Sequence, residues 1–420
     1  MRPVKHAARS LSLGVVLACV AGTMAIGVVT KSPCASGEWT DAKQYRLLCY
    51  TDIVPLLGTE QLAGGRWPFL DPCEETDASC DEYPVLTMYV MRLATLIGGT
   101  GYTGFYYTNA LLLGLAAATI ATCLWLLVGR RALWFALAPT LLIYGTVNWD
   151  LVAVAFATAA LLAFASRRDG WAGGMLGAGA ATKLYPLLLF LPLFLQGLRD
   201  REPDRSVRLL WWTAGTTIAI NLPFALVARA GWFEFFRFNA VRLPDFDSVW
   251  HISCRHIENA CTSTGRVNLL SGVAFAAVFG AAWWLKARRQ PGFPPWTLGL
   301  PLLIAFLLTN KVYSPQYGLW LLPWFALVGP DLRRFVAFQV ADVAVFVTRF
   351  WFFGALTGGY APPLPGFVSP QAWFELAVAL RAAVLVWVVV GWIRTESAPL
   401  VLGSRGWRTA QASQPVATPA

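Results

Sequence analysis

The sequence predicts an all-α protein that crosses a membrane many times, and three observations carry this prediction. Of its 420 residues, 57% are hydrophobic and 13% are charged, and the mean hydropathy is +0.54, which is typical of membrane proteins rather than water-soluble domains. Apolar runs such as 11–29, 109–128 and 268–285 approach the ~20 residues that a helix needs to cross a bilayer core. The alternating pattern of a membrane β-barrel does not occur, so we expect helical spans.

The positive charges lie in short clusters between the apolar runs. The net charge is +10, and Lys and Arg gather near residues 2–9, 130–131, 167–168, 199–208, 286–289, 333–334 and 394–408. Cytoplasmic loops of membrane proteins carry such an excess of basic residues. We therefore predict a multi-pass plasma-membrane protein with both termini in the cytoplasm, and we exclude nucleic acid as a partner.

This charge rule divides residues 1–394, a single membrane domain, into about twelve spans. The first run is predicted to be an uncleaved span; a signal peptide is the alternative, but the run is long enough to cross. The predicted spans are 11–29, 106–128, 134–147, 151–165, a hairpin of two short helices within 172–198, then 208–227, 267–285, 296–309, 316–328, 336–352 and 372–393. Residues 395–420 are predicted to form a disordered cytoplasmic tail.

Two loops, 31–105 and 229–266, are predicted to lie outside the cell. The stretch 31–103 alone holds ten of the 23 acidic residues. Within the first loop, the apolar segment 83–98 contains Arg92 and is not followed by a basic turn. We expect it to lie along the outer surface as a juxtamembrane helix, because a crossing there would place Arg130 and Arg131 outside.

Six of the eight cysteines fall in these outer loops, which favours disulfides. An even number on the oxidising side predicts two or three of them, with Cys73 and Cys80, and Cys254 and Cys261, as the natural close pairs. A metal site is the weaker alternative, since no CxxC spacing occurs.

Four motifs stand out: Tyr50-Thr51-Asp52-Ile53, Glu82-Tyr83-Pro84-Val85-Leu86-Thr87, Gly179-Ala180-Ala181-Thr182-Lys183-Leu184-Tyr185-Pro186 and Lys311-Val312-Tyr313-Ser314-Pro315-Gln316-Tyr317. Together they resemble glycosyltransferase family 87, within the GT-C superfamily. The likeness covers roughly residues 11–394. It implies a GT-C-like fold and a transferase that moves a sugar, with mannose favoured, from a polyprenyl-phosphate donor to a glycolipid or glycan acceptor at the outer membrane face.

The resemblance also implies that an acidic residue of the first outer loop is the general base, and the matching position is Asp52. Inverting transfer from a lipid phosphate needs one carboxylate, because phosphate is already a good leaving group. The alternative role for Asp52 is to cap the following helix. Glu82 and Asp150 each have two possible roles as well: binding of a sugar or of the acceptor, and capping of a helix. Tyr83 either stacks on a sugar or anchors at the membrane interface.

Lys183 stands in an apolar hairpin, where an ammonium group costs about 2.5–3.5 kcal/mol at the bilayer centre. We expect an anionic partner, the donor phosphate, with the Tyr185 hydroxyl as a further donor; snorkelling to the headgroups is the alternative. Four more residues at outer positions are predicted to bind substrate: His251, Lys311, Tyr313 and Arg349. A satisfied loop histidine is the alternative for the first of these.

Asp342 and Arg381 belong to the last two spans and lie near mid-depth, so they are predicted to form a structural ion pair. No resident cofactor is predicted, and a divalent cation stays open. The rival function is a membrane transporter or a lipid or glycan flippase. A single outward-facing cavity, open to lipid and holding both Asp52 and Lys183, would favour the transferase.

Overall fold

The computed structural model describes residues 12–400 except 75–79, 259–260, 361, 364 and 367. Within this part of the chain every regular element is a helix, which confirms the predicted all-α class. The first half contains α1 (Leu13–Lys31), α2 (Lys43–Arg46), α3 (Ile53–Thr59), α4 (Val85–Gly98), α5 (Tyr102–Val128), α6 (Leu133–Ala136), α7 (Pro139–Tyr144), α8 (Asp150–Ala165), α9 (Asp169–Ala180), α10 (Tyr185–Leu188) and α11 (Phe190–Arg199).

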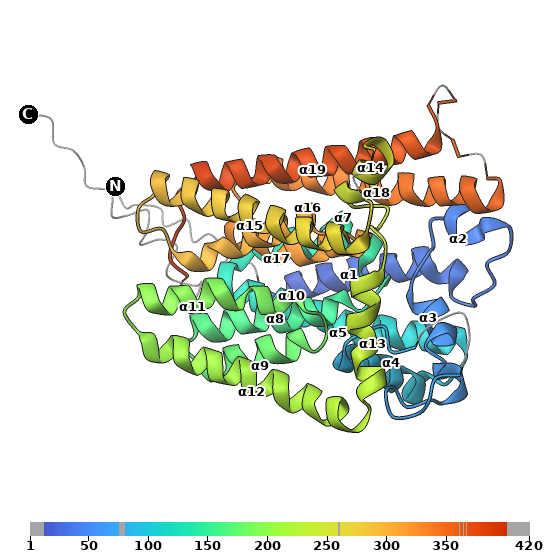
Figure 1. Cartoon of the computed structure of the whole chain (residues 1–420), viewed down its shortest axis with the longest axis horizontal. Helices are drawn as coiled ribbons and strands as arrows, with labels where there is room; N and C mark the ends of the chain where they lie inside the picture. Colours follow the sequence, from blue (N-terminus) through green and yellow to red (C-terminus); the bar gives the residue numbers. More distant parts are fainter. Residues whose placement is uncertain are drawn as a thin grey trace, which may run out of the picture.

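The second half contains α12 (Pro203–Val227), α13 (Arg229–Val241), α14 (Val249–His256), α15 (Thr264–Arg289), α16 (Gly299–Thr309), α17 (Gly318–Val328), α18 (Leu332–Gly358) and α19 (Pro370–Arg394). Short 3₁₀ helices lie at Ser32–Cys34, Thr40–Ala42, Leu62–Gly64, Gly129–Ala132, Pro295–Leu298 and Pro315–Tyr317. In Figure 1 the long helices run side by side, and α13 runs at a steep angle to them.

Six helical segments of the described chain are long and apolar enough to cross a membrane. They are Leu13–Cys34, Tyr102–Ala136, Pro203–Val227, Thr264–Arg289, Leu332–Gly358 and Pro370–Arg394. Shorter apolar helices cover Val85–Gly98, Asp150–Ala165, Tyr185–Arg199 and Pro295–Thr309. The multi-pass prediction is thus confirmed, while the number twelve stays a prediction.

The predicted third span, 134–147, is not one helix but two short ones, α6 and α7. Pro139 begins α7, and Ala138 before it is extended at φ −68°, ψ 126°. Proline has no backbone N–H and disfavours helical geometry in the residue before it, so a continuous helix ends here. The predicted hairpin at 172–198 is confirmed, because α9 ends at Ala180 and α10 begins at Tyr185 after a tight turn.

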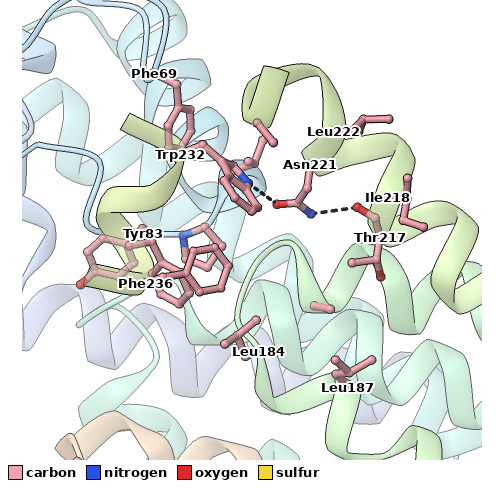
Figure 2. Close-up of a pocket in the computed structure, with 15 residues that line it drawn as sticks. Phe69, Tyr83, Leu184, Leu187, Thr217, Ile218, Asn221, Leu222, Trp232 and Phe236 are labelled. Carbon is pink, nitrogen blue, oxygen red and sulfur yellow. Dashed lines mark hydrogen bonds between the residues drawn. The ribbon is translucent and has the colours of Figure 1, made fainter. Parts of the chain in front are cut away.

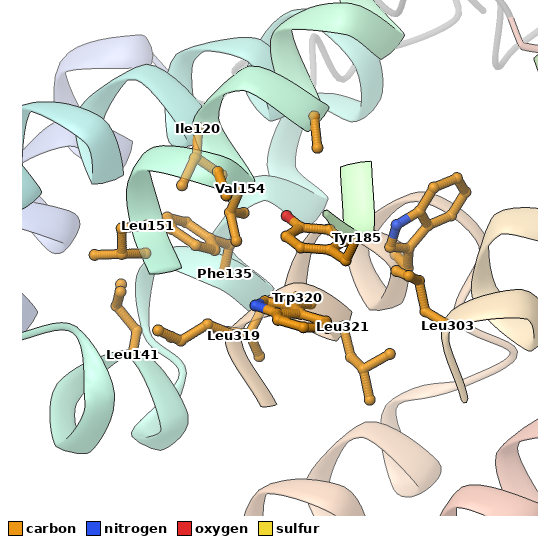
Figure 3. Close-up of a cluster of buried hydrophobic side chains, with 14 of the residues drawn as sticks. Ile120, Phe135, Leu141, Leu151, Val154, Tyr185, Leu303, Leu319, Trp320 and Leu321 are labelled. Carbon is orange, nitrogen blue, oxygen red and sulfur yellow. The ribbon is translucent and has the colours of Figure 1, made fainter. Parts of the chain in front are cut away.

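Small residues let α9 and α12 approach each other closely. A Cβ on Gly173 would lie 2.6 Å from the carbonyl oxygen of Leu209, and one on Gly177 would lie 2.7 Å from that of Thr213. Only glycine fits at both positions, as in other membrane helix pairs that pack through small residues. The core beside them joins α5, α8, α10, α16 and α17; Ile120, Val154, Leu303 and Trp320 lie in it (Figure 3).

Basic side chains bind helix ends at one end of the bundle. Arg131 donates to the carbonyl oxygens of Phe325 and Gly329, the latter at 2.9 Å, and Lys286 donates to the Trp392 carbonyl oxygen at 3.0 Å. The first residues of the predicted tail pack against this end instead of being disordered, because the backbone N–H of Ser397 donates to the side chain of Gln290 at 2.9 Å. Residues 401–420 lie outside the described chain.

The opposite end carries the two predicted outer loops, with α2, α3 and α4 gathered there (Figure 1). Three disulfides cross-link these loops. The two predicted close pairs are both confirmed. The bonds join Cys34 to Cys49, Cys73 to Cys80, and Cys254 to Cys261.

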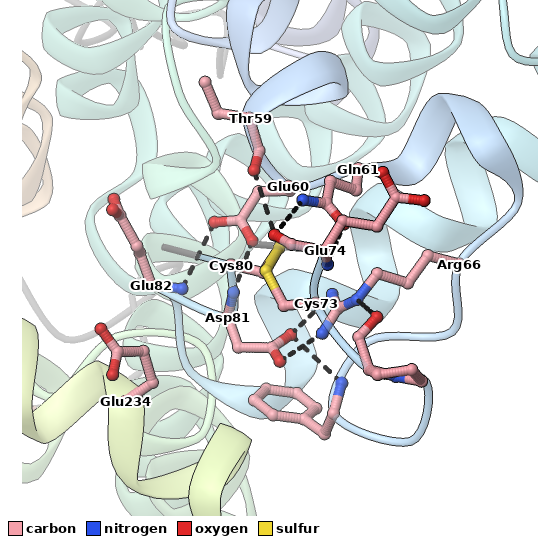
Figure 4. Close-up of a disulfide and its surroundings, with 12 residues drawn as sticks. Thr59, Glu60, Gln61, Arg66, Cys73, Glu74, Cys80, Asp81, Glu82 and Glu234 are labelled. Carbon is pink, nitrogen blue, oxygen red and sulfur yellow. Dashed lines mark hydrogen bonds and ion pairs between the residues drawn. A yellow bond between two sulfur atoms is a disulfide. The ribbon is translucent and has the colours of Figure 1, made fainter. Parts of the chain in front are cut away.

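A buried carboxylate organises the loop under the Cys73–Cys80 disulfide (Figure 4). Glu60 accepts the backbone N–H of Asp81 at 2.6 Å and that of Glu82 at 3.3 Å. Arg66 forms a two-pronged ion pair with Asp81, with N–O distances of 3.1 and 2.5 Å. Burial raises the pKa of Glu60 to about 8, with the neighbouring Asp81 and Glu82 charges adding to the effect. This arrangement fixes the backbone that leads into Tyr83.

Candidate functional site

Asp52 lies directly before α3, where a segment from another part of the chain holds its backbone. The hydroxyl of Thr51 donates to the carbonyl oxygen of Thr146 at 2.8 Å, and the N–H of Asp52 donates to the carbonyl oxygen of Val147 at 2.9 Å. The Asp52 side chain makes no capping hydrogen bond to α3. The capping alternative is therefore wrong, because the carboxylate turns to other partners.

Those partners are polar side chains from three separate elements. The Asn148 amide donates to Asp52 Oδ2 at 2.9 Å, and the same nitrogen donates to the Tyr83 hydroxyl at 2.9 Å. Gln316 lies at the limit of hydrogen-bond distance, 3.5 Å from Oδ2, and the Tyr50 hydroxyl also bonds to the carboxylate. Asp52 is half-buried.

The environment makes Asp52 a stronger base than an ordinary aspartate. Burial raises its pKa, while hydrogen bonds from Asn148 and Tyr50 and the charges of Lys183 and Arg349 act in the opposite direction. Burial prevails. A carboxylate with a raised pKa that stays ionised accepts a proton more readily, as a general base requires.

Lys183 lies in the turn between α9 and α10 and pairs with Asp150 at the start of α8. Both Asp150 oxygens lie 2.8 Å from Nζ, and the indole N–H of Trp320 donates to Oδ1 at 2.7 Å. Asp150 is fully buried and makes no capping bond to α8, so its capping alternative is wrong. The anionic partner that Lys183 needed is present within the protein.

Aromatic rings surround this ion pair. Lys183 Nζ lies 5.0 Å from the centre of the Tyr317 ring and 6.0 Å from that of Tyr83. The Trp320 ring is stacked between Tyr317, at 4.0 Å, and Tyr185, at 4.1 Å. Tyr185 is 3% exposed and part of the core in Figure 3, so it supports Trp320 and does not reach the surface beside Lys183.

Glu82 and Tyr83 occupy the edge of the site next to α13. Glu82 is half-buried, and Figure 4 places it near Glu234 of α13. Burial raises the Glu82 pKa, an effect that Arg242 opposes and Glu234 strengthens. The N-cap residue of α4 is Pro84, with no side-chain capping bond, so Glu82 does not cap that helix. Sugar binding by Glu82 stays a prediction.

A second cluster of charges collects the remaining predicted site residues. Arg349 pairs with Asp247 and lies 3.6 Å from Asp245. Burial raises the pKa of Asp247 to about 6; for Asp245 burial acts the same way, but Arg349 and Arg242 outweigh it and lower the pKa.

The predicted ion pair of Asp342 and Arg381 is confirmed at 3.3 Å. Arg381 also donates to the carbonyl oxygen of Asp247 at 3.1 Å and lies 3.7 Å from the centre of the Tyr313 ring. This second cluster joins α18, α19 and the loop before α14. Tyr313 therefore packs beneath a guanidinium group, and its part in substrate binding stays a prediction.

Lys311 and His251 contact other residues of the two loops and turns at this end of the protein. Lys311 donates to the carbonyl oxygens of Ala240 and Arg242, at 3.2 and 2.8 Å, and so ties the end of α13 to the α16–α17 turn. The His251 ring lies 4.6 Å from that of Phe246, and burial lowers its pKa. Substrate binding by His251 stays a prediction.

A groove with a volume of about 310 Å³ opens beside Tyr83 (Figure 2). Its lining is almost wholly apolar and comes from the Tyr83–Val85 segment, the α9–α10 region, α12 and α13. The residues are Phe69, Tyr83, Pro84, Val85, Ala180, Leu184, Leu187, Thr217, Ile218, Asn221, Leu222, Ala225, Trp232, Phe235 and Phe236. Asp52 and Lys183 do not line it, in contrast to the expectation of one shared cavity. Tyr83 joins the groove to both, because it shares Asn148 with Asp52 and faces Lys183.

In the described part of the chain, no group of three or more His, Cys, Asp or Glu residues is placed to hold a metal ion.

The family model for glycosyltransferase family 87 matches residues 83–315, more than half of the chain. The chain belongs to this family. It is therefore a glycosyltransferase, and the predicted resemblance is confirmed. A comparison with curated proteins finds no match.

Solved structures with a similar chain path include two of ArnT from Cupriavidus metallidurans. The one bound to undecaprenyl phosphate is 16% identical with a TM-score of 0.45, covering 91% of this chain and 78% of that one. The apo structure is 15% identical with a TM-score of 0.46, covering 91% and 76%. The archaeal oligosaccharyltransferase AglB from Archaeoglobus fulgidus, in complex with an inhibitory peptide and a dolichol-phosphate, is 12% identical with a TM-score of 0.41, covering 96% and 58%.

Sequence reasoning missed four residues of the site: Tyr50, Asn148, Gln316 and Trp320. Each lies in or next to a stretch already singled out, but none is charged, and no local pattern relates Asn148 to a carboxylate almost a hundred residues earlier. For Asn148, the available signal was that it is a polar residue in an otherwise apolar turn between helices.

Proposed function

We propose that this glycosyltransferase moves a sugar, mannose being the first candidate, from a polyprenyl-phosphate donor to a glycolipid or glycan acceptor, with inversion. The observation that carries the proposal is the junction at Tyr83. On one side lies an apolar groove, and on the other lie a half-buried carboxylate and a lysine. A lipid-linked sugar donor has an apolar chain that suits the groove, and a phosphate and a sugar that suit the polar side.

The apolar groove suits the isoprenoid part of the donor. Its walls are Leu, Ile, Val and aromatic side chains, and burying apolar surface contributes about 25 cal/mol per Å². Its edge at Tyr83 would place the phosphate near Lys183, whose side chain is 12% exposed. An ammonium group already held by Asp150 can still offer a remaining N–H to a phosphate oxygen, since lysine has three.

The reaction then needs one proton acceptor. The acceptor hydroxyl oxygen attacks the anomeric carbon while Asp52 takes the hydroxyl proton. The bond from that carbon to the phosphate oxygen breaks, and the polyprenyl phosphate leaves with the electron pair. Attack opposite the leaving group inverts the configuration. Lys183 would stabilise the charge that grows on the phosphate, and Arg349 would add a second positive charge near Asp52.

The acceptor would approach from the loop end of the bundle, where Glu82 is half-buried and can accept hydrogen bonds from sugar hydroxyls. With the basic end in the cytoplasm, as the charge rule predicts, this loop end faces outward at the plasma membrane. The disulfides of the loops agree with an oxidising compartment.

The test is sugar transfer by purified protein in nanodiscs, from synthetic polyprenyl-phosphate mannose to a lipid acceptor extract. Asp52→Asn is expected to lower the rate by roughly 10²–10⁴-fold, the usual contribution of general base catalysis. Asp41→Asn is the matched control, because Asp41 is an exposed acidic residue of the same loop. An unchanged rate in a folded Asp52→Asn protein would overturn the assignment of the base, and no transfer from any polyprenyl-phosphate sugar would overturn the donor class.

A further inference from the structure

The Asn148 side chain has all of its hydrogen-bonding groups engaged. Its amide nitrogen donates to Asp52 Oδ2 and to the Tyr83 hydroxyl, both at 2.9 Å, and its Oδ1 accepts the backbone N–H of Trp149 at 2.7 Å. An asparagine amide has two N–H donors and one carbonyl acceptor. A flipped amide would direct Oδ1 at the carboxylate and lose the Trp149 bond, so the network fixes the orientation.

The backbone that carries Asn148 is itself immobilised. Asn148 and Trp149 are each 1% exposed, and the Trp149 indole N–H donates to Asn109 Oδ1 at 2.7 Å. The preceding residues hold Asp52 from the backbone side, because the carbonyl oxygen of Val147 accepts the Asp52 N–H at 2.9 Å. The same short segment therefore fixes both the main chain and the side chain of Asp52.

We propose that Asn148 is the positioning residue for the general base: it aims the Asp52 carboxylate, keeps it ionised, and couples it to Tyr83 at the edge of the groove. This inference rests on the proposed function and adds a role that the function alone does not require. A hydrogen bond from a neutral donor stabilises the ionised carboxylate over the acid. Without Asn148, burial would favour the protonated form, which cannot accept the proton.

Several other groups act on Asp52, and they determine how large the effect of Asn148 is. The charged and titratable groups that face it from the packed elements are Lys31 of α1, Tyr50 of the first loop, Tyr83, Lys183 of the α9–α10 turn and Arg349 of α18. None of these makes the paired contact to both Asp52 and Tyr83, so their presence does not replace Asn148.

The test measures the pKa of Asp52 directly, in full-length protein in nanodiscs. Infrared difference spectra over a pH titration show a protonated-carboxyl band, and the part of it that Asp52→Asn removes belongs to Asp52. Asn148→Ala is expected to move the midpoint of that part upward by about one to two pH units, the size of a lost hydrogen bond to a charged group. Asn148→Asp, which keeps the shape of the side chain, is expected to move it further, since two carboxylates then share the site.

Asn109→Ala is the matched control. It also removes a buried asparagine hydrogen bond to the same turn, but Asn109 does not touch Asp52. It should lower the melting temperature and leave the Asp52 midpoint unchanged. In the transfer assay with polyprenyl-phosphate mannose, the acid limb of the pH–rate profile should follow the infrared midpoint in each variant.

An unshifted Asp52 midpoint in both folded Asn148 variants would overturn the inference. Equal shifts in Asn109→Ala and Asn148→Ala would also overturn it, because they would indicate a general loosening of the turn. Failure of the proposed function gives a different result: Asp52→Asn would then retain transfer, whatever the infrared titration of the Asn148 variants.

Discussion

Two of the buried charge clusters in the described part of the chain differ in access. The Asp52 cluster, with Lys183 and Asp150, borders a groove and contains a half-buried carboxylate. The cluster around Asp342 and Arg381 is closed, with these side chains 0% and 1% exposed. Charge buried in a membrane protein is costly in both places. The comparison teaches that access to substrate, rather than burial or ion pairing, separates a candidate reaction site from a structural pair.

The closed cluster connects elements from distant parts of the chain. Asp342 of α18 accepts from the Thr140 hydroxyl of α7 at 2.9 Å and from Arg381 of α19. Arg381 in turn bonds to the carbonyl oxygen of Asp247 in the second loop. The cluster therefore joins α7, α18, α19 and the second loop, which suits a structural role.

The largest effect on stability is expected from breaking this closed pair. Asp342→Leu leaves Arg381 buried without its carboxylate, which should lower the free energy of unfolding by about 3–5 kcal/mol. Thermal melting in nanodiscs measures it. The double variant Asp342→Leu/Arg381→Met should recover much of the loss, because no unpaired charge remains. A single variant as stable as the wild type would contradict the structural role.

In the open cluster, Lys183 is expected to contribute to binding of the lipid donor. Lys183→Met removes a charged hydrogen-bond donor, and transfer at low donor concentration should fall about 10–100-fold, corresponding to roughly 1.5–3 kcal/mol. Lys183→Arg, which keeps the charge, should lose less. Initial rates at several donor concentrations check this, and a loss that is independent of donor concentration and shared by Lys183→Arg would argue against phosphate binding.

A smaller effect is expected from Glu60, which stabilises the loop leading to Tyr83. Its folded-state pKa of about 8 lies above the usual 4.5, so between these values the folded protein holds a proton that the unfolded chain releases. The Glu60 contribution to stability is therefore fully present below pH 4.5 and is lost as the pH rises through 8. Glu60→Gln should flatten this part of the melting temperature profile. An unchanged slope in that variant would show that other groups cause it.

The sequence predicted the helical class and the close cysteine pairs, because these follow from hydropathy and short spacing. It also predicted the Asp342–Arg381 pair, since two intramembrane charges need each other. Lys183 was predicted to pair with a substrate phosphate, and the structure adds Asp150 as a partner within the protein, which the sequence did not indicate. Which of several buried charges meet depends on how short, broken helices turn, and composition does not encode that geometry.

The Asp52 site shows the same limit at the level of single residues. Asp52 and Tyr83 were recognised in their motifs, but the side chain that joins them, Asn148, comes from a third segment. Neither local propensity nor residue type distinguishes it from an ordinary polar turn residue. Lys311 was expected to bind substrate for its position at an outer turn, which stays a prediction; its two backbone carbonyl partners were not indicated by the sequence.

The most direct test compares one carboxylate of each cluster under the same conditions. Asp52→Asn and Asp342→Asn both neutralise a buried or half-buried aspartate with minimal change in shape, and both transfer rate and melting temperature are measured in nanodiscs. We predict that Asp52→Asn lowers the transfer rate by roughly 10²–10⁴-fold while the protein stays folded, and that Asp342→Asn lowers the melting temperature while the remaining folded protein transfers sugar. The reverse pattern, with a fully active Asp52→Asn and a stable but inactive Asp342→Asn, would contradict it.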